Sequence, residues 1–432
     1  MVLLRQIRFG NVAMNRMQLA GCLCWALLTF GSATAQQAVS RLSSSQTWYA
    51  DEAAFSRHDF AWLKDSSLAG HRAVYPKNHN ARKEPYLLLK INLPAPAIYE
   101  FSSYALPVVK ITQMPANGYR MRWQLNGSRV TNRIVYDAYK GGYQYIGKFD
   151  LPAGESLLKV WLPTGMALGY ISCKAYEAPA LPAGMADYKP AIIPPAEHPR
   201  LWVTPSFLPE LQQRIKAPEN QAAWHKVEQR AVKVFEYNPD STRESFYDAE
   251  LEELIREKAF YFLINGDAKV GREAVALMHK YFSVLEFGNV TYGDITREIG
   301  RAIYTGSLVY DWCYYLLDPS QKEYLRMHML RLARDMEIGW PPFVDPIING
   351  HANEAQVSRD LLSMSIAMYN EDTVPYRYTS FALLEQLVPM REFEYQSPRH
   401  NQGVDYGAYR FGWEMHGAML FYRMLGQKLY PD

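Results

Sequence analysis

Two short polar runs near the C-terminal end of the sequence carry side chains suited to acid–base chemistry. One is Asn349-Gly-His-Ala-Asn-Glu354 and the other is Gln402-Gly-Val-Asp-Tyr-Gly-Ala-Tyr-Arg410. The Asn-Gly pair interrupts the backbone and a helix is predicted to follow it, which places His351 in the first helical turn. Unpaired N–H groups and the helix dipole disfavour an imidazolium there, so we expect a neutral His351 that can accept a proton.

The first run predicts a helix with one polar and one apolar face. Glu354 follows His351 by three residues and Ser358 follows it by seven, so the three side chains share a face. The other face is apolar, with Val357, Leu361, Leu362 and Ile366. The alternative interpretation is structural: an acidic residue favoured in a first turn beside a hydrogen-bonded interior histidine. A lone His-x-x-Glu pattern would favour that alternative.

The second run adds a phenol with a nearby cation. Tyr406 and Arg410 are four residues apart on one helical face, close enough for the guanidinium to favour loss of the phenol proton. Without such a neighbour a tyrosine is a poor base at neutral pH. Ordinary aromatic packing remains the alternative in a chain with 31 tyrosines.

The elements that must position these groups are helices, predicted over residues 200–432. Apolar residues recur at helical intervals in successive segments, among them 295–317, 321–338, 352–369 and 379–390. Amphipathic helices of similar length predict antiparallel hairpins, which periodicity alone allows to form either a toroid or an α-solenoid.

Residues 45–178 instead predict an antiparallel β-sandwich, because short runs rich in β-forming residues alternate with turn signals. Asn126-Gly127 predicts a hairpin. Exposed tryptophan or tyrosine in this module could stack on sugar rings, although a spacer without a ligand is the favoured alternative. Six prolines in residues 179–199 predict a stiff linker at a domain boundary.

Residues 1–35 have the pattern of a cleavable secretory signal. They contain three arginines, no acidic residue, an apolar run and Ala-Thr-Ala35, so we expect cleavage after Ala35 and a secreted or periplasmic protein. The apolar run is too short to predict a transmembrane helix. Losing three arginines takes the net charge from +2 to about −1, and without a basic stripe nucleic acid is a poor candidate partner.

Cysteine and histidine usage predicts no metal site in this chain. Only Cys173 and Cys313 follow the signal, which excludes a disulfide framework but leaves a single bridge open. The ten histidines are scattered, and neither a His-x-x-x-His pattern nor a carboxylate loop with metal spacing is present.

Several ordered motifs from His198 onward resemble the toroidal domain of the heparinase II/III-like polysaccharide lyases, with the heparinase II branch nearest. The matching segments are His198-Pro-Arg-Leu-Trp202, Gly293-Asp-Ile-Thr-Arg297, Val309-Tyr-Asp-Trp-Cys-Tyr314, Gly339-Trp-Pro-Pro342, Gly350-His-Ala-Asn-Glu354, Arg359-Asp-Leu-Leu-Ser363 and Gln402-Gly-Val-Asp-Tyr406. The resemblance implies an incomplete (α/α) toroid after the β module and catalytic roles for His351, Glu354 and Tyr406. It implies cleavage of an acidic polysaccharide, of the heparan or alginate type, by β-elimination.

These roles follow from what β-elimination from a uronate requires. Tyr406 would protonate the leaving oxygen, and Tyr406 or His351 would remove the C5 proton according to the uronate epimer. Glu354 could suppress the substrate charge only in its protonated form. Candidate substrate-binding residues are Arg410, Arg297, Asn349 and Gln402. For Arg297 an ion pair with Asp294 or Glu298 is an equal alternative.

The sequence also departs from the family. Members continue into a β-sandwich domain that carries a further active-site histidine and, in heparinase II, a structural metal. We therefore expect a truncated chain, with no cofactor in this part and with the choice between monomer and homodimer open. Two other functions stay open: an α/α-barrel glycoside hydrolase using Glu354 and Asp405, and a glycan-binding protein without catalysis.

Overall fold

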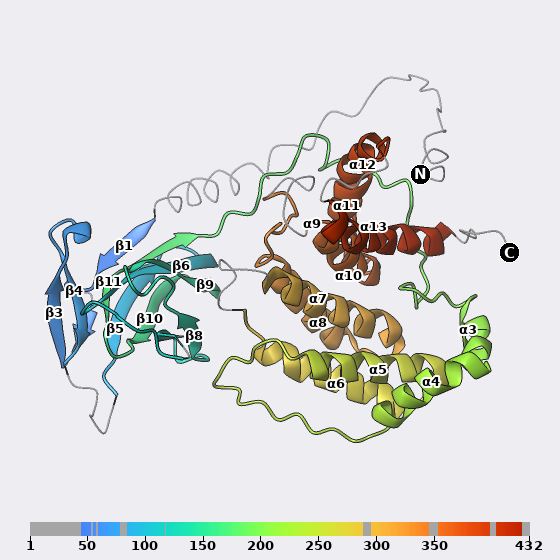
Figure 1. The fold of residues 1–432 in the computed structure, drawn as a ribbon, viewed down its shortest axis with the longest axis horizontal. Helices are drawn as coiled ribbons and strands as arrows, with labels where there is room; N and C mark the ends of the chain where they lie inside the picture. The colour runs from blue at the N-terminus through green and yellow to red at the C-terminus, as the bar shows by residue number, and fades with distance from the viewer. Residues whose placement is uncertain are drawn as a thin grey trace, which may run out of the picture. The chain divides into compact units, whose positions relative to one another are not determined.

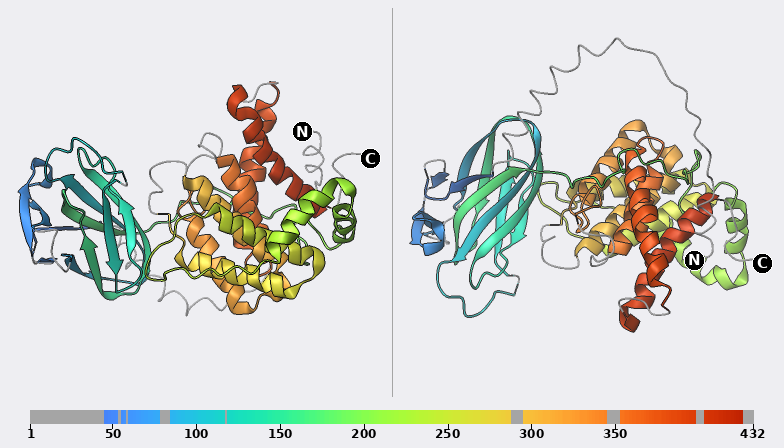
Figure 2. Two further views of the ribbon diagram at one scale, coloured as in Figure 1. Left: turned by 60° about the horizontal axis from the view of Figure 1, so that its bottom comes forward. Right: turned by 90° about the horizontal axis from the view of Figure 1, so that it is seen from above.

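The structure is a computed structural model of the 432-residue chain. It describes residues 45–425 except for 53–54, 58, 78–83, 117, 288–294, 345–352 and 398–402. This part of the chain divides into two compact units (Figures 1 and 2). The β unit runs to Glu177 and also includes Ser241–Glu244, while the helical unit comprises Ala178–Asp240 and the residues from Ser245 onward.

The β unit consists of two antiparallel sheets. One has the strand order β3-β4-β11-β6-β9 with β1 also paired to β11, and the other has the order β2-β5-β10-β7-β8. The strands are β1 Gln46–Tyr49, β2 Phe55–Arg57, β3 Phe60–Lys64, β4 Arg72–Pro76, β5 Leu87–Leu93, β6 Ala97–Pro107, β7 Arg120–Leu125, β8 Thr131–Ile134, β9 Gly142–Leu151, β10 Gly154–Trp161 and β11 Met166–Ala175. The predicted antiparallel β-sandwich is therefore confirmed.

Strand β7 shows how the sequence builds this unit. Its residues alternate between the buried core, as for Trp123, and a partly exposed outer face, as for Arg122. The predicted hairpin follows it, because Asn126 and Gly127 adopt φ angles of 49° and 70° and set Trp123 opposite Thr131.

Four residues from the second half of the sequence complete the β unit. Val130 N donates to Thr242 O at 2.9 Å, and Arg133 Nη1 donates to Glu244 Oε2 at 2.7 Å. Both side chains of that ion pair are buried. A buried guanidinium needs a charged partner, and here the partner comes from residues 241–244, which the sequence placed in the helical domain.

The helical unit begins with five helices and a short 3₁₀ turn, which are α3 Leu208–Ile215, α4 Pro218–Ala231, α5 Ala249–Asn265, α6 Ala268–Val284, α7 Ile295–Trp312 and η3 Tyr314–Leu316. It continues with α8 Pro319–Ala333, α9 Asn353–Ala355, η4 Gln356–Leu361, α10 Leu362–Ala367, α11 Val374–Phe381, η5 Ala382–Leu387, α12 Val388–Glu394 and α13 Gly403–Leu425. Capping aspartates fix where two of these helices begin. Asp248 accepts from Leu251 N at 3.0 Å at the start of α5, and Asp318 accepts from Gln321 N at 2.9 Å at the start of α8. Helix α8 ends at Ala333, five residues before the predicted end. The backbone then turns, with hydrogen bonds from Asp335 N to Leu332 O and from Met336 N to Ala333 O.

Two of the predicted helices contain a wider π turn. Segments α9, η4 and α10 follow one another without interruption, as do α11, η5 and α12, and η4 and η5 are π-helical. A π turn shifts the phase of the side chains that follow it. Ser358, expected on the polar face with Glu354, is instead buried, and its Cβ lies 3.2 Å from where a side chain at Gly417 of α13 would begin.

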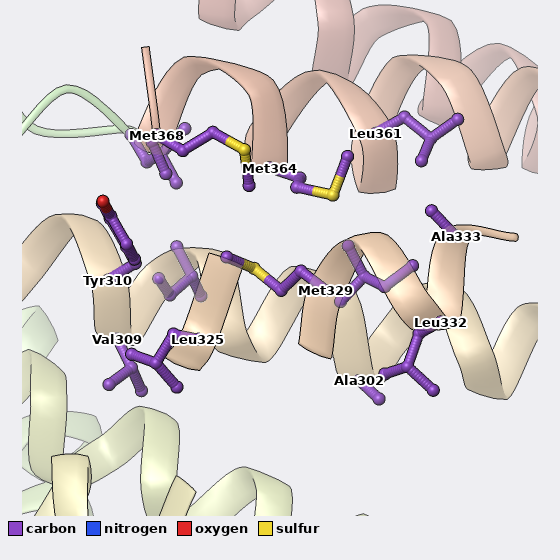
Figure 3. Packing of buried hydrophobic residues seen from close by; sticks show 14 of the residues in the cluster. Ala302, Val309, Tyr310, Leu325, Met329, Leu332, Ala333, Leu361, Met364 and Met368 are labelled. Carbon is purple, nitrogen blue, oxygen red and sulfur yellow. The ribbon is translucent and has the colours of Figure 1, made fainter. Parts of the chain in front are cut away.

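Figure 3 shows the part of the helical unit's core where α7, α8 and the η4–α10 helix meet. Val309, Met329 and Met364 come from these three elements and are fully buried. The residues of the predicted apolar face are fully buried: Val357, Leu361, Leu362 and Ile366. The predicted opposite polar face is wrong, because Glu354, Gln356 and Ser358 are buried as well. Closure of the helices into an incomplete toroid stays a prediction.

The proline-rich stretch 179–199 belongs to the helical unit. Tyr376 Oη donates to Ile192 O at 2.7 Å, and Arg377 Nη1 donates to Ala186 O at 2.8 Å. Ile192 is also buried. These residues are therefore held against the helices rather than forming a separate linker.

Candidate active site

The candidate site is organised around the carboxylate of Glu354. It lies in α9 and is completely buried. Arg391 Nη2 of α12 donates to its Oε1 at 2.9 Å, and Arg410 Nη1 of α13 donates to its Oε2 at 2.7 Å. One carboxylate thus joins three helices that are up to 56 residues apart in the sequence.

Arg391 extends this contact into a larger charged cluster. Its Nε donates to Glu414 Oε1 at 2.5 Å, and it also pairs with Glu394. Tyr395 Oη donates to Glu414 Oε2 at 2.6 Å. Burial disfavours the charge on Arg391, but Glu414 and Glu394 outweigh this effect and raise its pKa. Burial and Glu414 also raise the pKa of Tyr395, so this phenol keeps its proton.

This environment changes the role of Glu354. Each of its two carboxylate oxygens is engaged by a guanidinium group, from Arg391 and from Arg410, so neither oxygen is open to a substrate. The side chain is also fully buried. Glu354 is therefore placed to position other groups rather than to contact a sugar.

The same contact redefines Arg410, which was predicted to bind substrate. Its side chain is buried and is engaged by Glu354. Its guanidinium carbon lies 5.8 Å from the centre of the Tyr406 ring and 5.5 Å from that of Trp413. Arg410 therefore connects the buried carboxylate to the aromatic rings of α13.

Tyr406 is the exposed member of this arrangement. It lies in α13 one turn before Arg410, and 52% of its surface is accessible. A half-exposed phenol beside a fixed guanidinium can both contact a ligand and exchange a proton. Among the predicted site residues that the structure describes, Tyr406 is the one best placed for chemistry.

The remaining predicted residues divide into two groups. Arg297 lies in the first turn of α7 and is partly exposed. His351, Asn349 and Gln402 lie outside the described residues, as does the side chain of Asp405.

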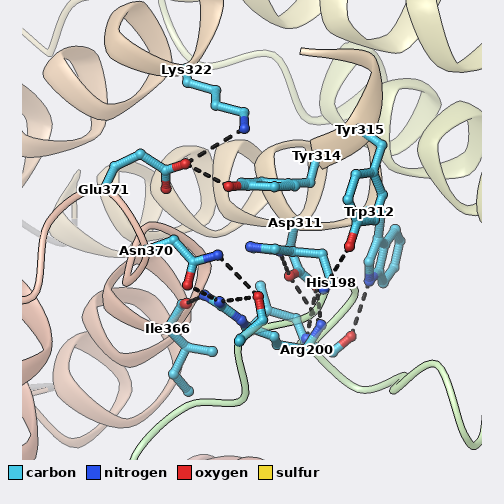
Figure 4. Close-up of polar contacts among 12 residues, drawn as sticks. His198, Arg200, Asp311, Trp312, Tyr314, Tyr315, Lys322, Ile366, Asn370 and Glu371 are labelled. Carbon is cyan, nitrogen blue, oxygen red and sulfur yellow. Dashed lines mark hydrogen bonds and ion pairs between the residues drawn. The ribbon is translucent and has the colours of Figure 1, made fainter. Parts of the chain in front are cut away.

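A second polar network, which the sequence did not predict, fastens residues 198–202 to α7 (Figure 4). Asp311 accepts from His198 Nδ1 at 2.7 Å, from Arg200 N at 2.8 Å and from Leu201 N at 2.8 Å. His198 also stacks on Tyr314 at 3.6 Å. Burial lowers the pKa of His198 despite Asp311, so the imidazole is held neutral. Residues 198–202 and 309–314 both belong to the motifs that resemble the lyase family, and here they bind each other.

A third cluster lies between α7, η4 and α13. The Trp202 ring meets His416 edge-on at 4.3 Å, and Trp202 Nε1 donates to Tyr304 Oη at 2.8 Å. Burial lowers the pKa of His416 to about 3, with the nearby Arg359 adding to the effect. Trp202 adopts a φ of 66°, a strained conformation for a side chain of this size. In the sequence, the feature that could have indicated this cluster is Trp202, the last residue of the His-Pro-Arg-Leu-Trp motif.

Buried carboxyl groups also lie along α5 and η4. Glu252 accepts from Thr305 Oγ1 at 3.1 Å and from Arg256 Nη1 at 3.4 Å, and burial raises its pKa to about 8. Asp360 pairs with Arg359 at 2.5 Å, yet burial still raises its pKa. Both carboxyl groups are held by arginines inside the helical unit.

The described residues contain no group of three or more histidine, cysteine, aspartate or glutamate side chains that could hold a metal ion. Cys173 and Cys313 are buried free thiols in different units. None of the described helices combines the length and apolarity that a membrane span needs.

Comparison with known proteins finds no matching protein-family model and no matching curated protein. A family 35 carbohydrate-binding module from Clostridium thermocellum is 13% identical over 31% of this chain and 99% of its own, with a TM-score of 0.24. A family 35 module from Cellvibrio japonicus is 13% identical over 31% of this chain and 95% of its own, with a TM-score of 0.25. The GH26-CBM35 β-(1,4)-mannanase from Podospora anserina is 13% identical over 77% of this chain and 74% of its own, with a TM-score of 0.26. Similarity at this level assigns neither a family nor a ligand to the chain.

Proposed function

We propose that the helical unit is the catalytic part of a polysaccharide lyase that cleaves a uronate-containing chain by β-elimination. In this reaction a base removes the proton at C5, the C4–O4 bond breaks, and an acid protonates the departing oxygen. The product carries a C4–C5 double bond. No oxidant, reductant or nucleophilic water is consumed.

The observation that carries the proposal is the buried ion pair between Glu354 and Arg410. It fastens the helix that begins at Asn353, two residues after His351, to the helix that presents Tyr406. The sequence predicted that these two helices deliver their polar groups to one place. A direct bond between the helices supports that prediction.

In this proposal Tyr406 is the catalytic acid, and it is also the base for one uronate epimer. Its half-exposed ring can reach a bound sugar, and the guanidinium carbon of Arg410 lies 5.8 Å from the ring centre. His351 is the proposed base for the other epimer. Glu354 becomes a positioning residue, because it holds Arg410 and does not reach a ligand.

We further propose that the chain belongs with the heparinase II/III-like lyases and that its helices form an incomplete α/α toroid. The ordered motifs from His198 to Tyr406 support this proposal. The leader proposed for residues 1–35 would deliver the enzyme to the periplasm or the exterior, where such polymers are found.

The hydrolase alternative is weakened by the same geometry. An inverting or retaining glycosidase needs two carboxyl groups facing the sugar. Glu354 is fully buried between two arginines, so it cannot be one of them.

The test is incubation of the purified chain with heparin, heparan sulfate, chondroitin sulfate and alginate. The expected result is a rise in ultraviolet absorbance from the unsaturated uronate, together with new chain ends. New reducing ends without that absorbance would indicate a hydrolase. No product from any of the four polymers would count against the lyase.

A further inference from the structure

Three half-exposed tyrosines lie within eight residues of the β unit: Tyr136 and Tyr139 in the connection from β8 to β9, and Tyr143 at the start of β9. The exposed fractions are 50% for Tyr136, 49% for Tyr139 and 53% for Tyr143. We call residues 136–143 the aromatic loop. Large aromatic side chains are normally among the well-buried residues, so three within eight positions are a feature to be explained.

The side chain of Gln144 holds both ends of the aromatic loop. Gln144 is buried, and its side chain accepts from Tyr136 N at 2.7 Å and donates to Tyr136 O at 2.9 Å and to Gly142 O at 3.2 Å. Ala138, in the middle of the loop, is part of the sandwich core. The loop is therefore fixed in one conformation before any ligand arrives, which reduces the entropy cost of binding.

The close approach of the backbone at Gly141 reinforces this rigidity. Its φ is 77°, and a Cβ there would lie 2.6 Å from the carbonyl oxygen of Ala105. Gly141 N also donates to Asp137 O at 2.9 Å. Only glycine fits this position without moving β6.

Tyr143 also begins a row of tyrosines that crosses the sheet. In the strand register Tyr143 lies opposite Tyr104, Tyr104 opposite Tyr170, and Tyr170 opposite Tyr49. Directly opposed residues point to the same face of a sheet. The rings of Tyr104 and Tyr170 stack with centres 5.4 Å apart. Tyr143 is thus the exposed end of an aromatic surface that continues into partly buried rings.

The chemistry of the aromatic loop favours a sugar chain as its occupant. Charged, exposed Asp137 and Lys140 separate the tyrosines, and an apolar protein surface would bury these charges without partners. A pyranose has an apolar C–H face that can lie on an aromatic ring and a rim of hydroxyl groups that can pair with Asp137, Lys140 and the phenols. Tyrosine offers a large rigid contact at low entropy cost together with its own hydroxyl group.

We infer that Tyr136, Tyr139 and Tyr143 form a binding platform for a polysaccharide chain, with pyranose rings stacked on the tyrosine rings. Resting on the proposed function, the inference makes the bound chain the same acidic polymer that the helical unit cleaves. The platform keeps the enzyme on that polymer between cleavage events. It acts by holding substrate and takes no part in the bond-breaking step.

The experiment is affinity electrophoresis of the full chain in gels that contain heparin, chondroitin sulfate, alginate or a neutral galactomannan. The expected result is retardation in at least one acidic polymer. The double variant Tyr139→Ala/Tyr143→Ala should then weaken binding by about tenfold, equivalent to roughly 1.4 kcal/mol. The double variant Tyr139→Phe/Tyr143→Phe keeps the rings and should retain most of the binding.

The matched control is Tyr86→Ala, which removes a partly exposed tyrosine beside the other sheet and should leave retardation unchanged. Circular dichroism of each variant checks that it folds. The platform is overturned if no polymer retards the chain, or if the Tyr139→Ala/Tyr143→Ala variant is retarded as strongly as the parent. It is also overturned if only galactomannan binds, or if the alanine variant changes self-association in place of glycan binding.

Binding is measured without turnover, so this test and the test of the lyase can fail separately. Tyrosine-dependent retardation in a chain that forms no unsaturated product would keep the platform and remove the proposed function. If the chain has lyase activity, and its KM for long polymers is the same in the parent and in the Tyr139→Ala/Tyr143→Ala variant, the proposed function is kept and the platform is removed.

Discussion

The carboxylate of Glu354 and the guanidinium of Arg410 form a buried ion pair of 2.7 Å across 56 residues of sequence. The pair sets the distance between α9 and α13. It also fixes the cation beside Tyr406, at 5.8 Å from the ring centre. The strength of this ion pair therefore determines whether Arg410 stays in one position beside Tyr406.

Replacing Glu354 by glutamine should destabilise the protein strongly. The amide keeps the shape but leaves the buried Arg410 without a negative partner, and breaking a buried pair in this way costs about 3–5 kcal/mol. Chemical denaturation followed by circular dichroism measures the loss. Glu323→Gln, at an exposed ion pair with Arg326, is the matched control and should cost under about 1 kcal/mol. Equal unfolding midpoints for the two variants would show that Glu354 does not hold these helices together.

Replacing Tyr406 by phenylalanine should lower kcat on the polysaccharide substrate by about 10²–10⁴-fold, the usual contribution of a general acid or base. Its ring is half exposed, so stability should change by less than about 0.5 kcal/mol. Appearance of the unsaturated product measures the rate. Tyr315→Phe, at another exposed tyrosine of the helical unit, should keep the parent rate. A Tyr406→Phe enzyme as fast as the parent would remove the phenol from the mechanism.

Glu252 predicts a specific pH dependence of stability. Burial raises the pKa of this carboxyl to about 8 in the folded protein, above the ordinary value near 4.5. The folded state therefore holds a proton that the unfolded state releases, so this contribution is fully present below about pH 4.5. It is lost as the pH rises through about 8, by roughly 1.4 kcal/mol per pH unit at most.

Glu252→Gln removes the titrating group and keeps its shape. Unfolding free energies measured by urea denaturation from pH 5 to pH 9 should fall less steeply for this variant than for the parent. The difference between the two curves isolates Glu252 from the buried histidines, which titrate in the opposite sense. Parallel curves would mean that this carboxyl is already ionised in the folded protein.

Gly300→Ala should destabilise the contact between α7 and η4. A Cβ at position 300 would lie 1.9 Å from Asp360 Oδ2, and Arg359 holds that short buried side chain in place. Relieving such a clash typically costs about 1–3 kcal/mol. Gly412→Ala is the control, because nothing lies within 4 Å of its added Cβ and it should stabilise helix α13 by roughly 0.5–1 kcal/mol. Thermal unfolding should show a lower melting temperature for Gly300→Ala and a higher one for Gly412→Ala than for the parent.

Much of the fold could be predicted because its signals are local. Asn126-Gly127 permits the left-handed turn that a tight hairpin needs, and Asp248 and Asp318 supply the oxygen that caps a helix start. Elements without such signals were missed. Helix α4 is mostly exposed and has a single buried residue, and β6 has buried residues on both faces and a bulge that breaks its alternation.

The candidate site was predictable in part for a similar reason. The spacing of Tyr406 and Arg410 on one helix is a local property, and the structure confirms that the two side chains lie close together. Arg391 was not predicted, because nothing near it in the sequence shows that its partner is Glu354, 37 residues earlier.

The sequence by itself determined the division into a β part and a helical part, and the elements with strong local signals, because these depend on neighbours a few residues apart. Only the tertiary structure decided that Glu354 is a buried, doubly paired carboxylate and that Tyr406 is the exposed group. Burial and charge pairing depend on which distant segments pack together, and the free energy of a charged side chain depends on those surroundings.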